Sequence, residues 1–164
     1  MENPESVEIL GKEFILWVLI NQIGHIIYKA RDKELGQNDV TIRQSSILLI
    51  VNAIKEAGGV ATPNEISKWS LREPNTVSAL ISRMERDGLI TKSRGSGKWN
   101  NHIIVELTEK GEQAYRLSLN KGIIQEILSC FSEEEYEIIF SLLKRLRDNA
   151  LEKTTIAREV PFPQ

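Results

Sequence analysis

The sequence predicts a mainly α-helical fold that contains one small β-hairpin. Three helix-start motifs, a Ser or Thr followed three residues later by Glu or Gln, occur at 41–44, 62–65 and 132–135. Apolar residues at helical spacing follow each motif. Segments 89–93 and 102–107 have strand character and enclose the Gly-, Ser- and Asn-rich loop "RGSGKWNN". We therefore expect a hairpin set among helices.

Composition places the chain among globular proteins and limits its surroundings. Its 164 residues suit one domain with a helical extension, and 41% are hydrophobic and 27% charged. One cysteine excludes an intramolecular disulfide and favours a reducing compartment. The first ten residues are acidic and polar, unlike a secretory signal, and the apolar run 14–20 is too short to cross a bilayer. We expect a cytoplasmic protein with no membrane association.

The first helix is apolar on nearly every side from 14 to 20 and continues through 23–28. A surface helix of a monomer would show one apolar stripe. Burial on two sides is typical of a dimer core, and the last helix, which follows Ser132, carries a similar apolar set, including Phe140 and Leu146. The predicted dimerisation residues are Phe14, Trp17, Val18, Tyr136, Ile139 and Leu143.

The middle of the chain predicts a helix-turn-helix followed by the hairpin. A helix starts at Thr41 and stops at Gly58-Gly59, and a short helix starts at Thr62. The next helix begins at Pro74 and ends at Gly88. After the hairpin, Thr108 caps a helix predicted to run towards Cys130. The predicted buried stripes are Ile47, Leu48, Val51, Ile54, Ile66, Trp69, Val77, Leu80, Ile81 and Met84.

The outer face of the 74–87 helix is small, polar and free of acids. An ordinary solvated face would carry Lys and Glu, whereas a helix in the DNA major groove needs short side chains that admit base edges. Groove binding is the favoured interpretation and a plain solvated face the alternative. The predicted base-facing residues are Asn75, Thr76, Ser78, Ala79 and Ser82.

Charge is distributed unevenly along the chain. Segment 62–101 has seven basic and four acidic residues, whereas the rest of the chain has 14 basic and 19 acidic residues. Arg72 and Arg83 could contact DNA or form salt bridges to nearby acids, and we favour DNA. Arg94 and Lys98 in the loop region could contact phosphate or only aid solubility. Trp99 could fold back on the lobe, contact DNA sugar or contact a partner.

The segment "ATPNEISKWSLREPNTVSALISRMERDGLI", followed by "VELTEKGEQAY", resembles the MarR family of bacterial and archaeal transcription regulators. Within it, "TVSALISRMERDGLI" looks like the recognition helix and first wing strand, and "LTEKG" like the start of a dimerisation helix. The resemblance covers roughly 41–118. The family's wing usually carries an Asp-x-Arg pair, and "GSGKWNNH" here has neither residue.

The resemblance implies a homodimer with two winged-helix lobes that bind a near-palindromic operator in double-stranded DNA. The expected division is a dimerisation helix in 1–40, the winged helix-turn-helix lobe in 41–107, and dimerisation helices with a loose tail in 108–164. It also implies a small-molecule or redox signal, with aromatic and phenolic compounds as the family precedent. Trp17, His25 and Tyr28 could line the effector pocket or simply pack in the core.

The remaining motifs argue against other functions. The two histidines lie near no nucleophile motif, no glycine-rich phosphate loop is visible, and no Cys or His cluster suits zinc. Cys130 has three glutamates nearby, which favours a small apolar residue over a redox sensor. The prediction is a DNA-binding repressor that is not an enzyme and needs no cofactor or metal. The alternative is a winged-helix protein-interaction module.

Overall fold

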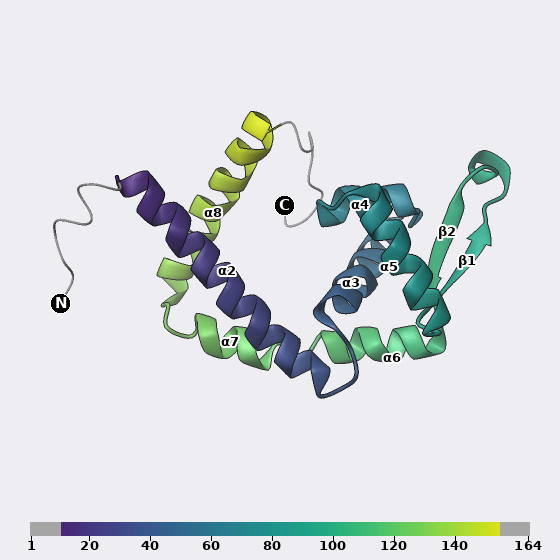
Figure 1. Ribbon diagram of the computed structural model, residues 1–164, viewed down its shortest axis with the longest axis horizontal. Helices are drawn as coiled ribbons and strands as arrows, with labels where there is room; N and C mark the ends of the chain where they lie inside the picture. Colours follow the sequence, from purple (N-terminus) through teal and green to yellow (C-terminus); the bar gives the residue numbers. More distant parts are fainter. Residues whose placement is uncertain (1–10, 155–164) are drawn as a thin grey trace.

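The computed structural model describes residues 11–154, and it confirms a mainly helical fold with one small antiparallel hairpin. A lobe containing the hairpin occupies one side of the molecule, and two long helices extend on the other (Figure 1). In chain order the elements are α2 (Lys12–Gly36), α3 (Ile42–Glu56), α4 (Pro63–Ser70), α5 (Pro74–Arg86), β1 (Ile90–Arg94), the 3-10 turn η1 (Gly97–Trp99), β2 (Ile103–Leu107), α6 (Glu109–Ser118), α7 (Gly122–Leu128) and α8 (Glu133–Thr154).

The hydrophobic core of the lobe is built from the stripes that the sequence predicts. α3, α4 and α5 each turn one apolar face inward, and the hairpin closes the core from the side. Leu80 and Trp69 are only partly buried and pack at its margin. The fully enclosed members include Ile47, Leu48, Val51, Ile54, Ile66, Val77, Ile81, Met84, Ile90 and Val105.

Two of the three predicted capping boxes form completely. Thr41 Oγ1 accepts from the Gln44 amide at 3.2 Å, and the Gln44 side chain accepts from the Thr41 amide at 2.9 Å. Ser132 and Glu135 exchange the same pair of bonds at the start of α8.

The third box, at Thr62, is half formed. Thr62 Oγ1 accepts from the Glu65 amide at 3.2 Å, but the Glu65 carboxylate pairs with Lys68 at 2.6 Å instead of returning to the cap. The hydroxyl bond alone satisfies one of the free amides at the start of α4. The prediction of a reciprocal box here was wrong because an ammonium one turn away competes for the carboxylate.

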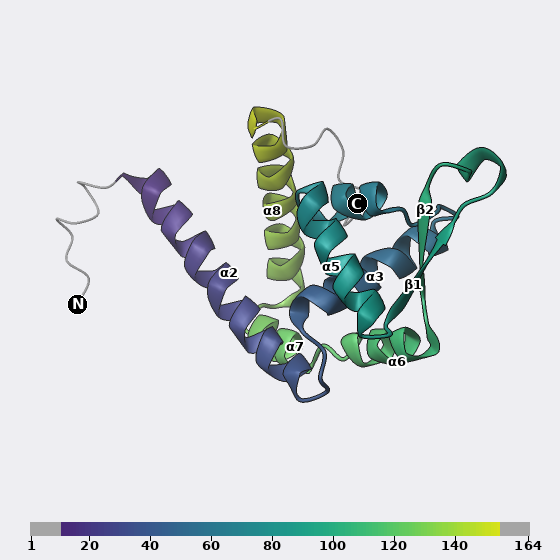
Figure 2. The same ribbon diagram turned by 45° about the vertical axis from the view of Figure 1, so that its right-hand side comes forward.

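The hairpin is fixed to the lobe through its backbone. Ile90 pairs with Leu107 and Arg94 with Ile103, which sets the register of β1 and β2. The Val105 amide also donates to the Ala61 carbonyl at 2.8 Å, so β2 is held against the connection between α3 and α4. The hairpin therefore projects from the lobe in a defined direction, beside α5 (Figure 2).

α6 docks on the turn that ends α5. Thr108 Oγ1 donates to the Gly88 carbonyl at 2.6 Å, and the Thr108 amide donates to the Leu89 carbonyl at 3.1 Å. The same hydroxyl accepts from the Gly111 amide at 3.0 Å and caps α6. A Cβ at Gly111 would lie 1.9 Å from the Leu89 carbonyl oxygen. Only glycine permits this approach, which explains the last residue of "LTEKG".

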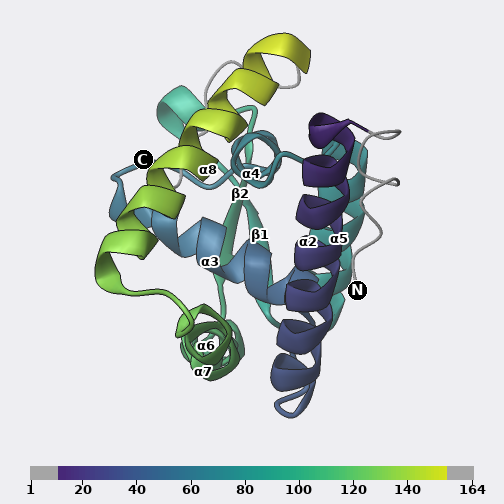
Figure 3. The ribbon, with the colours of Figure 1, turned by 90° about the vertical axis from the view of Figure 1, so that its left-hand side faces the viewer.

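The predicted single helix from Thr108 towards Cys130 is broken at 119–121. α6 and α7 nevertheless run roughly in line along the base of the molecule. In Figure 1 α6 lies below the lobe and α7 below α2, and Figure 3 shows both end-on. The Ser118 and Asn120 carbonyls accept from the Arg31 guanidinium, and the Asn120 side chain accepts from the Gly122 amide at 3.2 Å. The bonds from Arg31 and the local bond from Gly122 replace the backbone hydrogen bonds that a continuous helix would form here. The prediction of one helix was therefore wrong.

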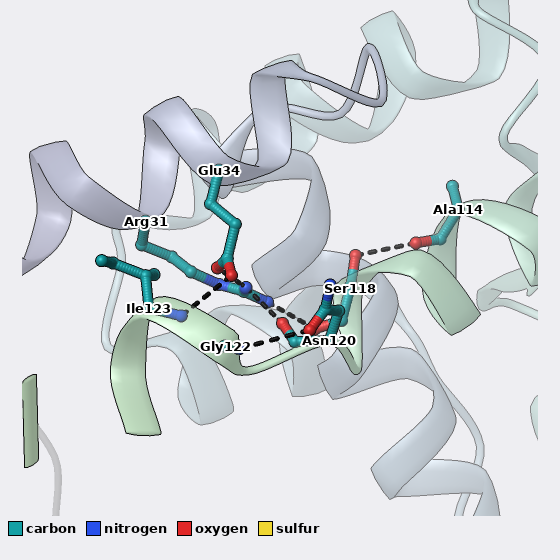
Figure 4. Close-up of polar contacts among 7 residues, drawn as sticks. All are labelled: Arg31, Glu34, Ala114, Ser118, Asn120, Gly122 and Ile123. Carbon is teal, nitrogen blue, oxygen red and sulfur yellow. Dashed lines mark hydrogen bonds and ion pairs between the residues drawn. The ribbon is translucent and has the colours of Figure 1, made fainter. Parts of the chain in front are cut away.

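Arg31 and Glu34 of α2 form a latch on this break (Figure 4). Their side chains pair with each other and are 11% and 19% exposed. Glu34 also accepts from the Ile123 amide at 3.0 Å, at the start of α7. That backbone hydrogen bond, helped by Arg31, holds the pKa of Glu34 below its ordinary value. The latch joins the first helix to the junction between the lobe and the last helices.

α2 and α8 diverge from the base of the molecule like the arms of a V (Figure 2). Only Leu35 of α2 is buried, and α8 has no buried residue. Trp17 is 58% exposed, Ile26 62% and Ile138 59%. The α8 residues predicted to face inward, among them Tyr136 and Phe140, are therefore exposed or half-buried within a single chain.

None of the helices in residues 11–154 has the length and hydropathy needed to span a bilayer. The predicted loose tail "EVPFPQ" lies outside the described residues.

We expect Gly111→Ala to destabilise the protein by roughly 1–3 kcal/mol, because overpacking must push α6 away from Leu89. Urea unfolding followed by circular dichroism measures this change. Gly36→Ala is the matched control, since a Cβ at Gly36 meets nothing within 4 Å. Equal midpoints for the two variants would contradict the tight docking of α6.

We expect Glu34→Gln to lower the thermal midpoint at pH 7, with the difference from wild type shrinking in acid. Because the folded state lowers the pKa of Glu34, its carboxylate stabilises the fold at pH values above its ordinary pKa of 4.5. This stabilisation is lost as the pH falls through the pKa of the folded state. Melting curves between pH 7 and pH 3 test this, with Glu126→Gln on α7 as the control. A constant difference at every pH would show that the ionised latch is not stabilising.

Candidate nucleic-acid interface

A tight turn fixes the angle between α4 and α5. The buried Ser67 hydroxyl donates to the Arg72 carbonyl at 2.6 Å, and the Arg72 amide donates to the Ser67 carbonyl at 3.2 Å. Leu71 between them adopts the left-handed conformation, with φ 52°. A non-glycine residue there carries backbone strain, so the two hydrogen bonds hold the turn in a conformation it would otherwise leave.

The outer face of α5 is exposed along its whole length. Val77, Ile81 and Met84 hold the opposite face in the core. No carboxylate occurs between residues 74 and 84, so the exposed face is uncharged until Arg83. The structure brings together on this face the predicted residues Asn75, Thr76, Ser78, Ala79, Ser82 and Arg83.

A lysine that the sequence analysis missed joins this face to the hairpin. Lys92 of β1 pairs with Glu85 at 2.8 Å, and its ammonium donates to the Ser82 hydroxyl at 3.3 Å. This bridge neutralises the acid at the end of α5 and places a cation beside Ser82. Only the hairpin register puts Lys92 next to α5, so spacing along the sequence could not have identified it.

Arg72 and Arg83 do not form the salt bridges considered as their alternative role. Within residues 11–154 neither guanidinium pairs with Glu73 or Asp87, and the Asp87 carboxylate accepts instead from the side-chain amide Nε2 of Gln44 at 3.1 Å. Arg83 is exposed and Arg72 half-buried. Both cations flank the small polar face of α5.

The hairpin carries the two remaining predicted cations. Arg94 ends β1, and Lys98 lies in the 3-10 turn at the tip; both are exposed. Trp99 is half-buried and folds back on the hairpin itself, with its ring against His102 at 5.4 Å between centroids. Of the three roles considered for Trp99, folding back on the lobe takes a different form here, since the ring packs on the hairpin itself and not on the body of the lobe.

The three residues proposed for an effector pocket lie in different surroundings. Trp17 and His25 are exposed on α2, with the Trp17 ring beside Phe14. Tyr28 lines a cavity of about 350 Å³ between α2, α3 and α5, together with Asp32, Thr41, Ile42, Arg43, Gln44, Leu80 and Arg83.

The remaining candidate groups offer little chemistry. Cys130 is exposed between α7 and α8, not buried as a small apolar residue would be, and its thiol donates to the Ile127 carbonyl at 3.5 Å. Across the described part of the chain, no group of three His, Cys, Asp or Glu residues is arranged to hold a metal ion. The α5 face with its flanking cations is thus the best-defined candidate site.

Proteins of similar sequence or fold are found among transcription regulators. No protein-family profile matches the sequence. The HTH-type transcriptional regulator YwoH of Bacillus subtilis (strain 168) is 27% identical over 128 residues, which cover 76% of this chain and 88% of YwoH.

Several solved structures superpose on most or all of this chain. The ligand-free organohalide-sensing regulator RdhR-CbdbA1625 superposes with a TM-score of 0.82 at 27% identity, covering 100% of this chain and 96% of that one. MepR of Staphylococcus aureus in its DNA complex gives 0.73 at 27% identity, covering 85% and 99%. A single-residue mutant of MarR from E. coli with operator DNA gives 0.72, covering 82% and 95%, and at 19% identity it supports the fold alone. In sequence and fold the chain therefore resembles transcription regulators of the MarR type.

Proposed function

We propose that this chain is a homodimeric, sequence-specific regulator of transcription that binds double-stranded DNA and represses by occluding a promoter. The observation that carries the proposal is the exposed, acid-free face of α5, held on a rigid core and flanked by cations of the turn and hairpin. Such a face admits base edges, and the surrounding cations suit phosphates. The supporting relatives are transcription regulators, not enzymes.

The roles of individual residues follow from their positions on this surface. Asn75, Thr76, Ser78 and Ser82 present short polar groups to the bases, and Ala79 allows the α5 backbone to approach closely. Phosphate contacts come from the cations around that face, whose attraction to DNA does not depend on sequence. These are Arg72, Arg83, Arg94 and Lys98.

The proposed homodimer is supported by the exposed apolar side chains of α2 and α8, the two long helices that we call the arms. A groove of about 620 Å³ between α2 and α8 is lined by apolar side chains from the two arms, among them Leu16, Ile20, Ile139, Leu142, Leu143 and Leu146. An apolar surface of this extent in one chain marks an interface. We assign 1–40 and 108–164 to dimerisation and 41–107 to DNA binding. Two α5 helices would then enter major grooves about 34–36 Å apart on a near-palindromic operator.

A small aromatic effector is the proposed signal. RdhR-CbdbA1625 has been crystallised with 2,4-dichlorophenol bound, and this chain superposes on that form with a TM-score of 0.82 at 28% identity. The cavity beside Tyr28 lies between α2 and the lobe, where a ligand would alter their relative position. Trp17 and His25 would belong to the pocket only if the dimer brings them towards it.

A protein-interaction module remains the second candidate function, because the same exposed face of α5 could pack on a protein partner. Salt separates the two candidates. DNA affinity falls steeply as salt rises, with a slope set by the number of phosphates neutralised, whereas an apolar protein contact lacks this dependence.

We expect Ser78→Glu to weaken operator binding on the order of 100-fold or more, because a carboxylate brought against base edges and phosphates is repelled and loses its hydration. The assay is a gel-shift titration at 50 and 200 mM salt, using a duplex selected by the wild-type protein from a random library. Gln113→Glu adds the same charge on α6 and should bind normally. Unchanged binding by Ser78→Glu would exclude α5 as the recognition helix.

We expect Leu143→Asp to convert the dimer to a monomer and to abolish high-affinity operator binding, since one lobe alone contacts only a half-site. Analytical ultracentrifugation measures the mass, and circular dichroism confirms that the lobe is folded. Ile103→Asp places the same charge on an exposed hairpin residue and should leave the mass unchanged. A Leu143→Asp dimer as stable as wild type would argue against the α8 interface.

A further inference from the structure

The tip of the hairpin is a closed, self-supporting loop (Figure 1). The Gly95 amide donates to the His102 carbonyl at 2.9 Å, and the His102 amide donates to the Trp99 carbonyl at 2.8 Å. The Trp99 amide in turn donates to the Ser96 carbonyl at 3.1 Å. These backbone bonds hold in place a loop whose composition alone would predict flexibility.

Trp99 forms the packed centre of this loop. A Cβ at Gly95 would lie 2.4 Å from the Trp99 carbonyl oxygen and 2.7 Å from the Trp99 Cβ, so only glycine fits opposite it. The Trp99 ring meets His102 edge-on, with an interplanar angle of 83°. Gly95 is buried although it lies near the tip of a projecting hairpin. Trp99 is therefore fixed by its own loop and not by the lobe.

The Lys98 ammonium lies 5.5 Å from the centroid of the Trp99 ring. A cation at this distance is attracted to the negative face of the ring. The loop offers no carboxylate, since "RGSGKWNNH" contains no acid, and no ion pair is formed by Lys98 within residues 11–154. The ring is thus the group that holds this lysine.

We propose that Trp99 is a positioning residue of the DNA interface, which holds the Lys98 ammonium at the tip of the hairpin for contact with a backbone phosphate. The inference rests on the proposed DNA-binding function and assigns a role to a wing that lacks an Asp-x-Arg pair. A free lysine side chain loses much rotamer freedom when it binds, and one already restrained on a ring loses less. The ring itself stays packed against His102 and does not enter the DNA.

A double-mutant cycle tests whether Trp99 acts through Lys98. Fluorescence anisotropy with a labelled duplex selected by the wild-type protein gives affinities at four salt concentrations from 50 to 200 mM. We expect Trp99→Ala and Lys98→Ala each to weaken binding by roughly three- to tenfold. Only Lys98→Ala should reduce the salt slope, by about one, because without the ring the free lysine still neutralises its phosphate at a greater entropic cost. The double variant should bind no more weakly than Lys98→Ala, because the two changes remove one contact.

Two further variants separate positioning from simple unfolding. Trp99→Phe keeps an aromatic face and should retain most of the affinity and the full salt slope. Gly95→Ala keeps both Lys98 and Trp99 but displaces the ring, and should resemble Trp99→Ala. Thermal midpoints of all variants should stay near wild type, since the tip lies outside the core. Preference for the selected duplex over random DNA should be unchanged, because a phosphate contact carries no sequence information.

Additive losses in the double variant would overturn the proposal, since Trp99 would then contact DNA independently. A salt slope unchanged by Lys98→Ala would also overturn it, since Lys98 would then contact no phosphate. In both cases the wild-type protein still binds DNA, so the proposed function stands. Failure of the wild-type protein to bind any DNA at 50 mM salt would instead overturn the proposed function and this inference together.

Discussion

The placement of the lobe relative to the long arms depends on the Arg31 guanidinium. It donates to Glu34 and to two carbonyls at the break between α6 and α7. Glu34 completes the contact by accepting from the first turn of α7. One ion pair thus joins α2 to the end of α6 and to the start of α7.

The lobe meets this junction through a second rigid contact. α6 lies so close to Leu89 that Gly111 cannot carry a side chain, and Thr108 binds the turn that ends α5. α5, the hairpin and α6 therefore move as one unit. If the proposed function is correct, the base-contacting face and the wing keep a fixed relation while the arms set the distance between two lobes. This arrangement suits a regulator whose signal alters spacing and leaves the recognition helix intact.

Local patterns predicted most of the lobe. The α3 stripe was correct, and the α5 stripe was correct except for the partly buried Leu80, because burial follows from helical period. The capping boxes at Thr41 and Ser132 were correct because capping involves neighbours. The Thr62 box was only half correct, since Lys68 competes for Glu65. The continuous helix after Thr108 was wrong, because its break depends on Arg31, 87 and 89 residues away from the carbonyls it binds. Nothing near 119–121 in the sequence reports that contact.

Most of the helices, both strands, most core-facing residues and the small polar face of α5 could be predicted from the sequence, since these depend on period, caps and residue size. It also identified Arg72, Arg83, Arg94 and Lys98 as candidate DNA contacts by charge. Two contacts could be found only in the folded chain: Lys92 lies beside Ser82, and Trp99 packs inside its own hairpin. Lys92 and Ser82 come from different elements, and the hairpin register sets their distance. Trp99 and His102 lie within one loop, and the geometry of its turn brings their rings together.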